Sequence, residues 1–96
     1  MQDEHFEWDD AKAAQNVARH KVSFETARKA FDDVLGIEVV DDREDYGEER
    51  FNLLGMVADR LLHVTFTVRA QRARLISARI AEPAERRRYH EENSQD

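Results

Sequence analysis

Cysteine is absent from this chain of 96 residues, and proline and glycine are scarce, with one proline and three glycines. Without cysteine there is neither a disulfide framework nor a thiolate metal site. The apolar runs fall far short of the roughly 20 residues that span a bilayer, and the acidic opening MQDEHFEWDD lacks the layout of a signal peptide. We therefore expect a cytoplasmic protein with no membrane partner.

The length limits the chain to a single domain. A chain of 96 residues has room for one small core, and no repeat or low-complexity linker divides it. We expect one domain over residues 1–96, with an ordered core over about 6–90 and a frayed tail over 91–96.

Lysine is missing from the second part of the chain, and arginine replaces it. Residues 1–59 carry 7 Lys+Arg against 16 Asp+Glu, whereas residues 60–96 carry 8 arginines against 5 acids, within a net charge of −6. Guanidinium groups are always charged and grip phosphate or carboxylate in a planar fork. The second part can therefore recognise an anion, although arginines paired with the acids of the first part would give the same composition.

Two helices are expected at the N-terminal end. Residues 9–20 are rich in good helix formers, with Asp9 as a cap, and a second helix over 23–33 begins at Ser23. Trp8 can pack against the face of the first helix that holds Ala11, Ala14, Val17 and Ala18. The face of the second helix holds Phe24, Ala27, Ala30 and Phe31.

Four strands and one helix are predicted to follow. The strands fall at 36–41, 48–57, 60–69 and 72–81, and short links between the last three favour an antiparallel meander. Pro83 suits the first turn of a last helix over 83–93. The predicted fold class is α+β, with two N-terminal helices, a four-stranded mainly antiparallel sheet and one C-terminal helix.

Alternation divides the strand residues between two faces. The core face is predicted to hold Phe51, Leu53, Val57, Leu62, Val64, Phe66, Val68, Ile76, Ala78 and Ile80. The opposite face takes Arg50, Asn52, His63, Thr65, Thr67, Arg69, Ser77 and Arg79, beside Leu54, Met56, Leu61 and Leu75. Three arginines on one face persist if they are solvated, paired with carboxylates or awaiting an anionic ligand, and alternation leaves all three possibilities open.

No metal site and no cofactor are expected. The four histidines lie in different elements without ligand spacing: His5, His20, His63 and His90. There is no Gly-rich phosphate loop and no Gly-flanked serine nucleophile. In the last helix, ERRRY offers Arg86, Arg87, Arg88 and Tyr89, which a solvated basic surface would also explain.

Several motifs follow one another in a recognisable order. The opening FEWDDAKAAQNVARHKVSFETARKAFDD is followed by GEERFNLLG, LLHVTFTVR, RLISAR and ERRRY. Over about residues 6–89 this order resembles the BrnT family, the toxin half of a type II toxin–antitoxin pair. The resemblance implies a RelE-like ribonuclease fold and a small BrnA-like antitoxin partner, whose DNA-binding domain represses the shared operon, so that DNA is reached only through the antitoxin.

The resemblance also marks individual positions. The matched motif positions are Lys12, Asn16, His20, Glu49, Arg50, Thr67, Arg69, Ser77, Arg79 and Tyr89. Two departures are Lys21, where the family has Gly, and Val34, where it has Pro. A Gly at position 21 would end the first helix with positive φ, a conformation that Lys adopts at a cost of about 1 kcal/mol.

The leading hypothesis is a metal-independent endoribonuclease that arrests translation, in which the RNA 2′-OH attacks the adjacent phosphate. Arg50, Arg69 and Arg79 are expected to clamp that phosphate. The acid–base candidates are Glu49, His63, His20 and Tyr89, in no fixed order. RNA contacts are expected from Lys12, His20, Thr67, Ser77 and Arg86.

The alternative hypothesis is a non-catalytic interaction module. In that case the arginine face docks an acidic segment of the antitoxin, and the protein acts as a co-repressor. Both roles can coexist, because an antitoxin could cover the arginines that RNA needs. Direct DNA binding by this chain alone is disfavoured, because the net charge of −6 is acidic and no helix carries a basic recognition face.

Overall fold

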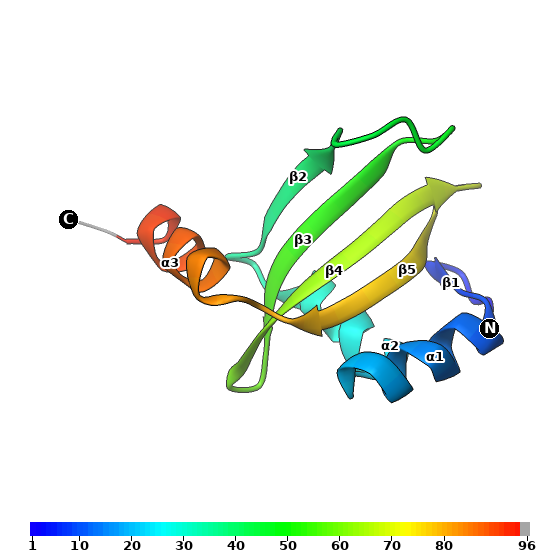
Figure 1. The fold of residues 1–96 in the computed structure, drawn as a ribbon, viewed down its shortest axis with the longest axis horizontal. Helices are drawn as coiled ribbons and strands as arrows, with labels where there is room; N and C mark the ends of the chain where they lie inside the picture. Colours follow the sequence, from blue (N-terminus) through cyan, green and yellow to red (C-terminus); the bar gives the residue numbers. More distant parts are fainter. Residues whose placement is uncertain (95–96) are drawn as a thin grey trace.

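A five-stranded sheet runs through the molecule with strand order β1-β5-β4-β3-β2 (Figure 1). The structure is a computed structural model, and it describes residues 1–94. Strands β2 (Ile37–Asp41), β3 (Arg50–Val57), β4 (Arg60–Arg69) and β5 (Arg72–Ile80) form the predicted antiparallel meander. The sequence therefore located all four of these strands, and alternation located β3, β4 and β5.

The prediction of four strands is wrong by one. A two-residue strand β1 (Phe6–Glu7) pairs in parallel with β5, so the sheet is mixed. Two residues are too few to show alternation, and a parallel partner far along the chain leaves no local turn signal.

The helices lie on both faces of the sheet (Figure 1). They are α1 (Asp10–His20), α2 (Phe24–Ala27) and α3 (Pro83–Glu92), and a 3-10 turn, η1 (Arg28–Asp32), continues α2. The second predicted helix is therefore one α-turn followed by a 3-10 turn. Helix α3 extends through Glu92, which lies within the tail expected to fray, and the last two residues of that tail, 95–96, lie outside the described residues.

The two ends of α1 follow the expected capping chemistry. The Asp9 carboxylate accepts a hydrogen bond from the Lys12 N–H at 3.0 Å. At the other end Lys21 adopts φ 61° and ψ 26°, the left-handed conformation that favours Gly. The expectation of positive φ at Lys21 is confirmed.

The main core lies between the sheet and the α2–η1 segment. It consists of Trp8, Val22, Phe24, Ala27, Ala30, Leu53, Leu62, Val64, Phe66, Leu75 and Ala78. The predicted face of the second helix is confirmed, since Phe24, Ala27 and Ala30 are fully buried. Gly55 permits the close approach of η1, because a Cβ on it would come within 2.5 Å of the Ala30 carbonyl oxygen.

The predicted face of α1 is wrong. Ala11, Ala14, Val17 and Ala18 are all exposed. Instead, the buried Asn16 side chain turns to β5, where it donates to the Ala78 carbonyl oxygen at 2.8 Å and accepts from the Ala78 N–H at 3.0 Å. Pairing these backbone groups fixes the rotation of the helix more strongly than small apolar residues do.

A β-bulge changes part of the predicted core face. The β4–β5 pairing jumps from Thr65↔Ser77 to Phe66↔Leu75. The extra residue brings Leu75 into the core in place of the predicted Ile76. Val68 and Ile80 were also predicted to be in the core, but they are exposed at the strand ends.

Helix α3 covers one end of the opposite sheet face and forms a second small core there. Its members are Leu54, Leu61, Ala81 and Tyr89, with Ile37 and Met56 packed against them. The helix starts with a capping box between Glu82 and Glu85. In the part of the chain that the structure describes, no helix combines the length and the apolar character needed to cross a membrane.

Candidate functional site

Beyond α3, the opposite sheet face carries polar side chains in cross-strand rows. One row pairs Leu54 with His63 and His63 with Arg79. The next row pairs Asn52 with Thr65 and Thr65 with Ser77. We call this surface the polar face; it comprises Arg50, Asn52, His63, Thr65, Thr67, Ser77 and Arg79.

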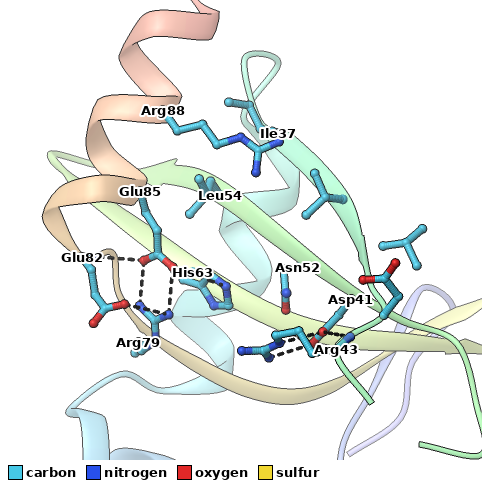
Figure 2. Close-up of a pocket in the computed structure, with 13 residues that line it drawn as sticks. Ile37, Asp41, Arg43, Asn52, Leu54, His63, Arg79, Glu82, Glu85 and Arg88 are labelled. Atoms are coloured by element: carbon cyan, nitrogen blue, oxygen red, sulfur yellow. Dashed lines mark hydrogen bonds and ion pairs between the residues drawn. The ribbon is translucent and has the colours of Figure 1, made fainter. Parts of the chain in front are cut away.

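A cleft of about 350 Å³ opens over the first row, between α3 and the β2–β3 loop (Figure 2). Its floor is His63, with Arg79 and Glu85 on one side and Arg43 on the other. The structure therefore brings together two of the predicted catalytic residues, His63 and Arg79.

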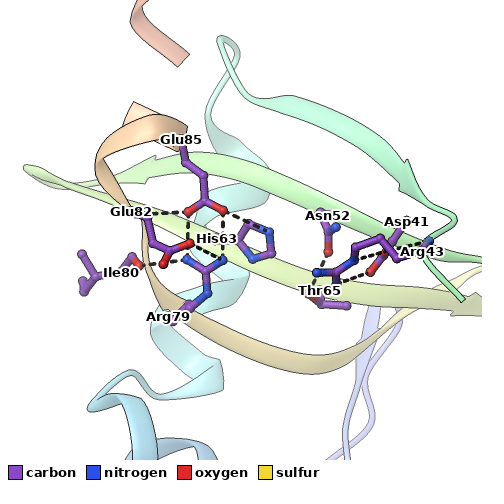
Figure 3. Close-up of polar contacts among 9 residues, drawn as sticks. All are labelled: Asp41, Arg43, Asn52, His63, Thr65, Arg79, Ile80, Glu82 and Glu85. Carbon is purple, nitrogen blue, oxygen red and sulfur yellow. Dashed lines mark hydrogen bonds and ion pairs between the residues drawn. The ribbon is translucent and has the colours of Figure 1, made fainter. Parts of the chain in front are cut away.

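Arg79 is held by a two-pronged ion pair. Its Nη1 and Nη2 donate to the two carboxylate oxygens of Glu85 at 2.8 and 2.9 Å (Figure 3). The Glu82 carboxylate lies 3.6 Å from Nη2, and the Glu82 N–H donates to Glu85 at 2.8 Å. Guanidinium hydrogen bonds lower the pKa of Glu85 to about 2, so this carboxylate stays ionised and fixes the orientation of Arg79.

His63 is largely buried, with 14% of its side chain exposed, and its Nε2 lies 3.7 Å from Glu85 Oε2. Burial lowers its pKa, and the positive charge of Arg79 lowers it further, against the opposing effect of Glu85. The imidazole is therefore neutral at neutral pH, which is the form that accepts a proton.

The other side of the cleft is formed by Arg43, which follows β2. Its Nε and Nη2 each donate at 2.8 Å to the buried carboxylate of Asp41 (Figure 3). These bonds hold the pKa of Asp41 well below its usual range. Between the two ion pairs, Thr65 donates to the Asn52 side chain at 2.8 Å.

Carboxylates outnumber arginines in the cleft. Among its described lining residues, Arg43, Arg79 and Arg88 face Asp41, Asp42, Glu82 and Glu85. In residues 1–94 no three His, Cys, Asp or Glu side chains are grouped so as to hold a metal ion. The cleft is therefore suited to orienting groups rather than to attracting anions over a distance.

A second hollow, the basic groove, lies between α1 and the sheet. Its lining is Lys12, Gln15, Asn16, Arg19, His20, Arg50, Ile76 and Ser77, around a volume of about 340 Å³. Within the described chain, no carboxylate lines this groove. It adjoins the cleft, because Ser77 in the groove and Asn52 in the cleft belong to the same cross-strand row.

Arg50 enters the basic groove from β3. Its guanidinium lies over the Tyr46 ring, 4.1 Å from the centroid, and its Nε is 3.6 Å from Glu48. Among residues 1–94, this Nε is the buried side-chain atom without a hydrogen-bond partner.

The three predicted arginines do not form one cluster. Arg69 and Arg50 are both near Glu48, which accepts a hydrogen bond from Arg69 at 3.0 Å. Arg79 is instead paired at the α3 end of the face. Glu49, Thr67 and Arg69 line a third hollow of about 290 Å³, where Thr67 donates to the Glu49 carbonyl oxygen at 2.6 Å.

Two predicted residues lie outside these hollows. The Tyr89 hydroxyl donates to Asp33 at 2.6 Å, and burial with this bond raises its pKa to about 12. This contact ties α3 to the segment before β2 and gives no support to an acid–base role. Arg86 donates to the Ala81 carbonyl oxygen at 2.9 Å and lies on the outer side of α3.

Sequence reasoning missed Arg43, Glu85 and Arg19. The spacing of Glu82 and Glu85 around Pro83 is a capping-box signal that could have placed Glu85 at the start of α3. Arg43 sits in an acidic loop without periodicity, so no pattern places it in the cleft. Arg19 lies three residues after Asn16 and on the same side of the helix, but only the Asn16 contact reveals that side.

A comparison with family models decides the class. The model described as "Ribonuclease toxin, BrnT, of type II toxin-antitoxin system" matches residues 8–85. The chain belongs to the BrnT family. The resemblance carried by the sequence motifs is thereby confirmed, and with it the class of ribonuclease toxin and the existence of a cognate antitoxin partner. A search of curated proteins found no match.

Proposed function

We propose that this BrnT protein is a metal-independent endoribonuclease whose catalytic centre is the His63–Arg79 cleft. One observation carries the proposal: a largely buried histidine with a lowered pKa lies beside an arginine that a carboxylate orients. The order of N-terminal helices, antiparallel strands and C-terminal helix supports the RelE-like assignment.

In this proposal the basic groove binds the RNA. Lys12, Arg19 and Arg50 attract the phosphate backbone, and Ser77 continues the surface toward Asn52 in the cleft. Because carboxylates prevail in the cleft itself, most of the electrostatic attraction would come from the groove. RNA binding and bond cleavage would then be served by adjacent parts of the polar face.

The chemistry follows from the groups in the cleft. Neutral His63 accepts the proton of the 2′-OH, and the 2′-oxygen attacks the adjacent phosphorus. The bond from phosphorus to the 5′-oxygen breaks, and the departing 5′-oxygen takes a proton from solvent water to become the 5′-OH. A guanidinium has five N–H donors, and in the described chain three Arg79 contacts engage only Nη1 and Nη2. Its Nε–H, which has no hydrogen-bond partner among the described residues, can donate to a phosphoryl oxygen as negative charge builds up.

The other acid–base candidates lie elsewhere. His20 lines the basic groove, and Glu49 lines the third hollow. Glu85 stays ionised, with a pKa of about 2, so it is a weak base. His63 is therefore our choice for the general base, with Arg50 and Arg69 serving RNA binding.

The mechanism can be tested with an RNA oligonucleotide and the purified chain. We expect products that end in a 2′,3′-cyclic phosphate and a 5′-OH, and unchanged cleavage in EDTA. An oligonucleotide with a 2′-deoxy sugar at the cut site should resist cleavage. Loss of activity in EDTA, or cleavage of the deoxy substrate at the normal rate, would overturn the proposal.

Translation arrest is the expected consequence in cells. The protein would act in the cytoplasm, where messenger RNA is translated, and cleavage of messenger RNA would slow growth. It would contact DNA only through the antitoxin. Expression of the chain alone, with and without Arg79→Ala, tests this. Growth arrest with shortened transcripts that needs Arg79 would support it, and growth arrest without transcript cleavage would oppose it.

A second function, antitoxin-dependent co-repression, is favoured by the pairing state of the arginines. Arg43, Arg69 and Arg79 each already bind a carboxylate, so acidic side chains of a partner could take the same positions. Harmless expression of the chain, together with tighter operator binding by the antitoxin in its presence, would favour this role over cleavage.

A further inference from the structure

The two edges of the sheet differ in how they are covered. At the β5 edge, β1 pairs with Ala73 and Arg74, and further along the Asn16 side chain bonds both backbone groups of Ala78. At the other edge β2 is the last strand, and no described segment pairs with its outer side (Figure 1). An open edge presents backbone N–H and C=O groups to an added strand.

Exposed aliphatic side chains gather at the β2 edge. Val34 is 96% exposed and Leu35 is 52% exposed just before the strand, and Val40 within it is 52% exposed. They are three of the six large hydrophobic residues exposed in the described chain. Single exposed aliphatics are ordinary, but a group of them along an open strand edge favours a partner.

The charge at this edge is strongly acidic. Residues 38–49 contain seven Asp or Glu and one Arg. Asp41 is paired with Arg43, and Glu48 with Arg69, but the described chain offers no ion pair to Glu38, Asp42, Glu44, Asp45 or Glu49. A second copy of the chain would place like charges opposite one another, which disfavours self-pairing. A basic partner is the complementary one.

We propose that an extended basic segment of the cognate antitoxin adds to the β2 edge as a sixth strand. Its aliphatic side chains would contact Val34, Leu35 and Val40, and its Lys or Arg side chains would face Glu38 and the acidic loop that follows β2. This inference uses the family membership, which supplies the partner, and not the proposed cleavage chemistry. Because β2 borders the cleft through Ile37, Val39 and Val40, the added strand would lie beside the cleft.

The proposal is tested by titrating the full chain with its co-encoded antitoxin in a calorimeter. We expect Glu38→Arg and Val40→Arg each to weaken binding at least tenfold. The matched controls are Glu25→Arg, an exposed acid on α2, and Val68→Arg, which is 54% exposed at the end of β4. The controls should bind as the parent does, and thermal melts should confirm that all four variants fold.

Hydrogen exchange supplies a second readout that needs no substitution. The amides of residues 37–41 should exchange more slowly in the complex, and raising the salt concentration should weaken binding. Parent-like affinity of both β2 variants, or unchanged exchange over β2 in the complex, would overturn the proposal. So would a chain that dimerises through β2 without antitoxin. Cleavage activity is not measured, so failure here leaves the proposed nuclease function untouched.

Discussion

The two ends of the polar face satisfy their arginines in opposite ways. At the α3 end, Arg79 is gripped by both oxygens of Glu85 beside a largely buried histidine. At the α1 end, where the basic groove opens, Lys12 and Arg19 have no ion pair among the described residues, and Arg50 has only the longer contact of 3.6 Å between its Nε and Glu48. Side chains fixed by ion pairs can orient a reacting bond, whereas cations without a close carboxylate partner attract a polyanion. The contrast separates the proposed cleavage end from the binding end.

Removing the held arginine should have the largest effect. Arg79→Ala is expected to slow cleavage by about 100-fold to 1,000-fold, because the phosphoryl charge loses its nearest donor. The same change leaves Glu85 near His63 and removes the repulsive charge, so the pKa of His63 should rise and the acid limb of the pH–rate profile should move to higher pH. Single-turnover cleavage across pH measures both effects.

Arg79→Lys serves as the matched control, since it keeps the charge without the planar fork. The Arg79→Lys variant should keep the acid limb of the parent's pH–rate profile but should cleave RNA more slowly than the parent. An Arg79→Ala protein that folds and cleaves at the parent rate would contradict the assignment of the α3 end.

Removing cations at the α1 end should weaken binding rather than chemistry. Lys12→Ala and Arg50→Ala are each expected to raise KM and to reduce the salt slope of RNA binding by about one phosphate contact. Arg60→Ala, at the exposed first residue of β4, is the control and should change neither KM nor the salt slope. Fluorescence anisotropy of a labelled RNA at several salt concentrations makes the comparison. If the two groove variants kept the parent slope, the groove would not be the binding end.

Neutralising Glu85, the carboxylate partner of Arg79, should slow cleavage less than Arg79→Ala does and should shift the pKa of His63 in the opposite direction. In Glu85→Gln the attraction that raises the pKa of His63 is lost, so the acid limb should move to lower pH. Arg79 is also oriented less firmly, and the rate at neutral pH should fall about tenfold or less. A shift of the acid limb to higher pH would show that Glu85 does not act on His63 in this way.

The smallest expected effect lies outside both ends. Lys21→Gly relieves the left-handed conformation at the end of α1 and should raise the free energy of unfolding by about 1 kcal/mol. Lys21→Ala keeps the unfavourable φ and is the control. Urea unfolding followed by circular dichroism gives both values, and equal stability of the Gly and Ala variants would contradict this account of the helix end.

Sequence patterns located most of the helices and strands because these elements depend on local chemistry. Alternation placed β3 to β5, and Asp9, Ser23 and Pro83 marked the helix starts correctly. The parallel pairing of β1 and the rotation of α1 about Asn16 depend on partners more than 60 residues away. No local pattern carries such information.

The sequence predicted which residues belong to the candidate site better than it predicted which of them lie close together. Alternation put His63 and Arg79 on one face, and the register confirms that they are cross-strand neighbours. Strict alternation along β5 could not foresee the bulge, which exchanges Ile76 for Leu75 in the core. The separation of Arg79 from Arg50 and Arg69 follows from ion pairs with Glu85 and Glu48, which only the folded chain brings together.

The pH dependence of cleavage by the parent and by His63→Gln tests the central claim most directly. The parent rate should rise with pH through one ionisation below 6.5, the ordinary pKa of histidine, because burial and Arg79 lower the pKa of His63. His63→Gln should be slower by about 100-fold or more and lack that ionisation, while His5→Gln, at an exposed histidine, should match the parent. A folded His63→Gln protein with the parent's rate and acid limb would contradict the account.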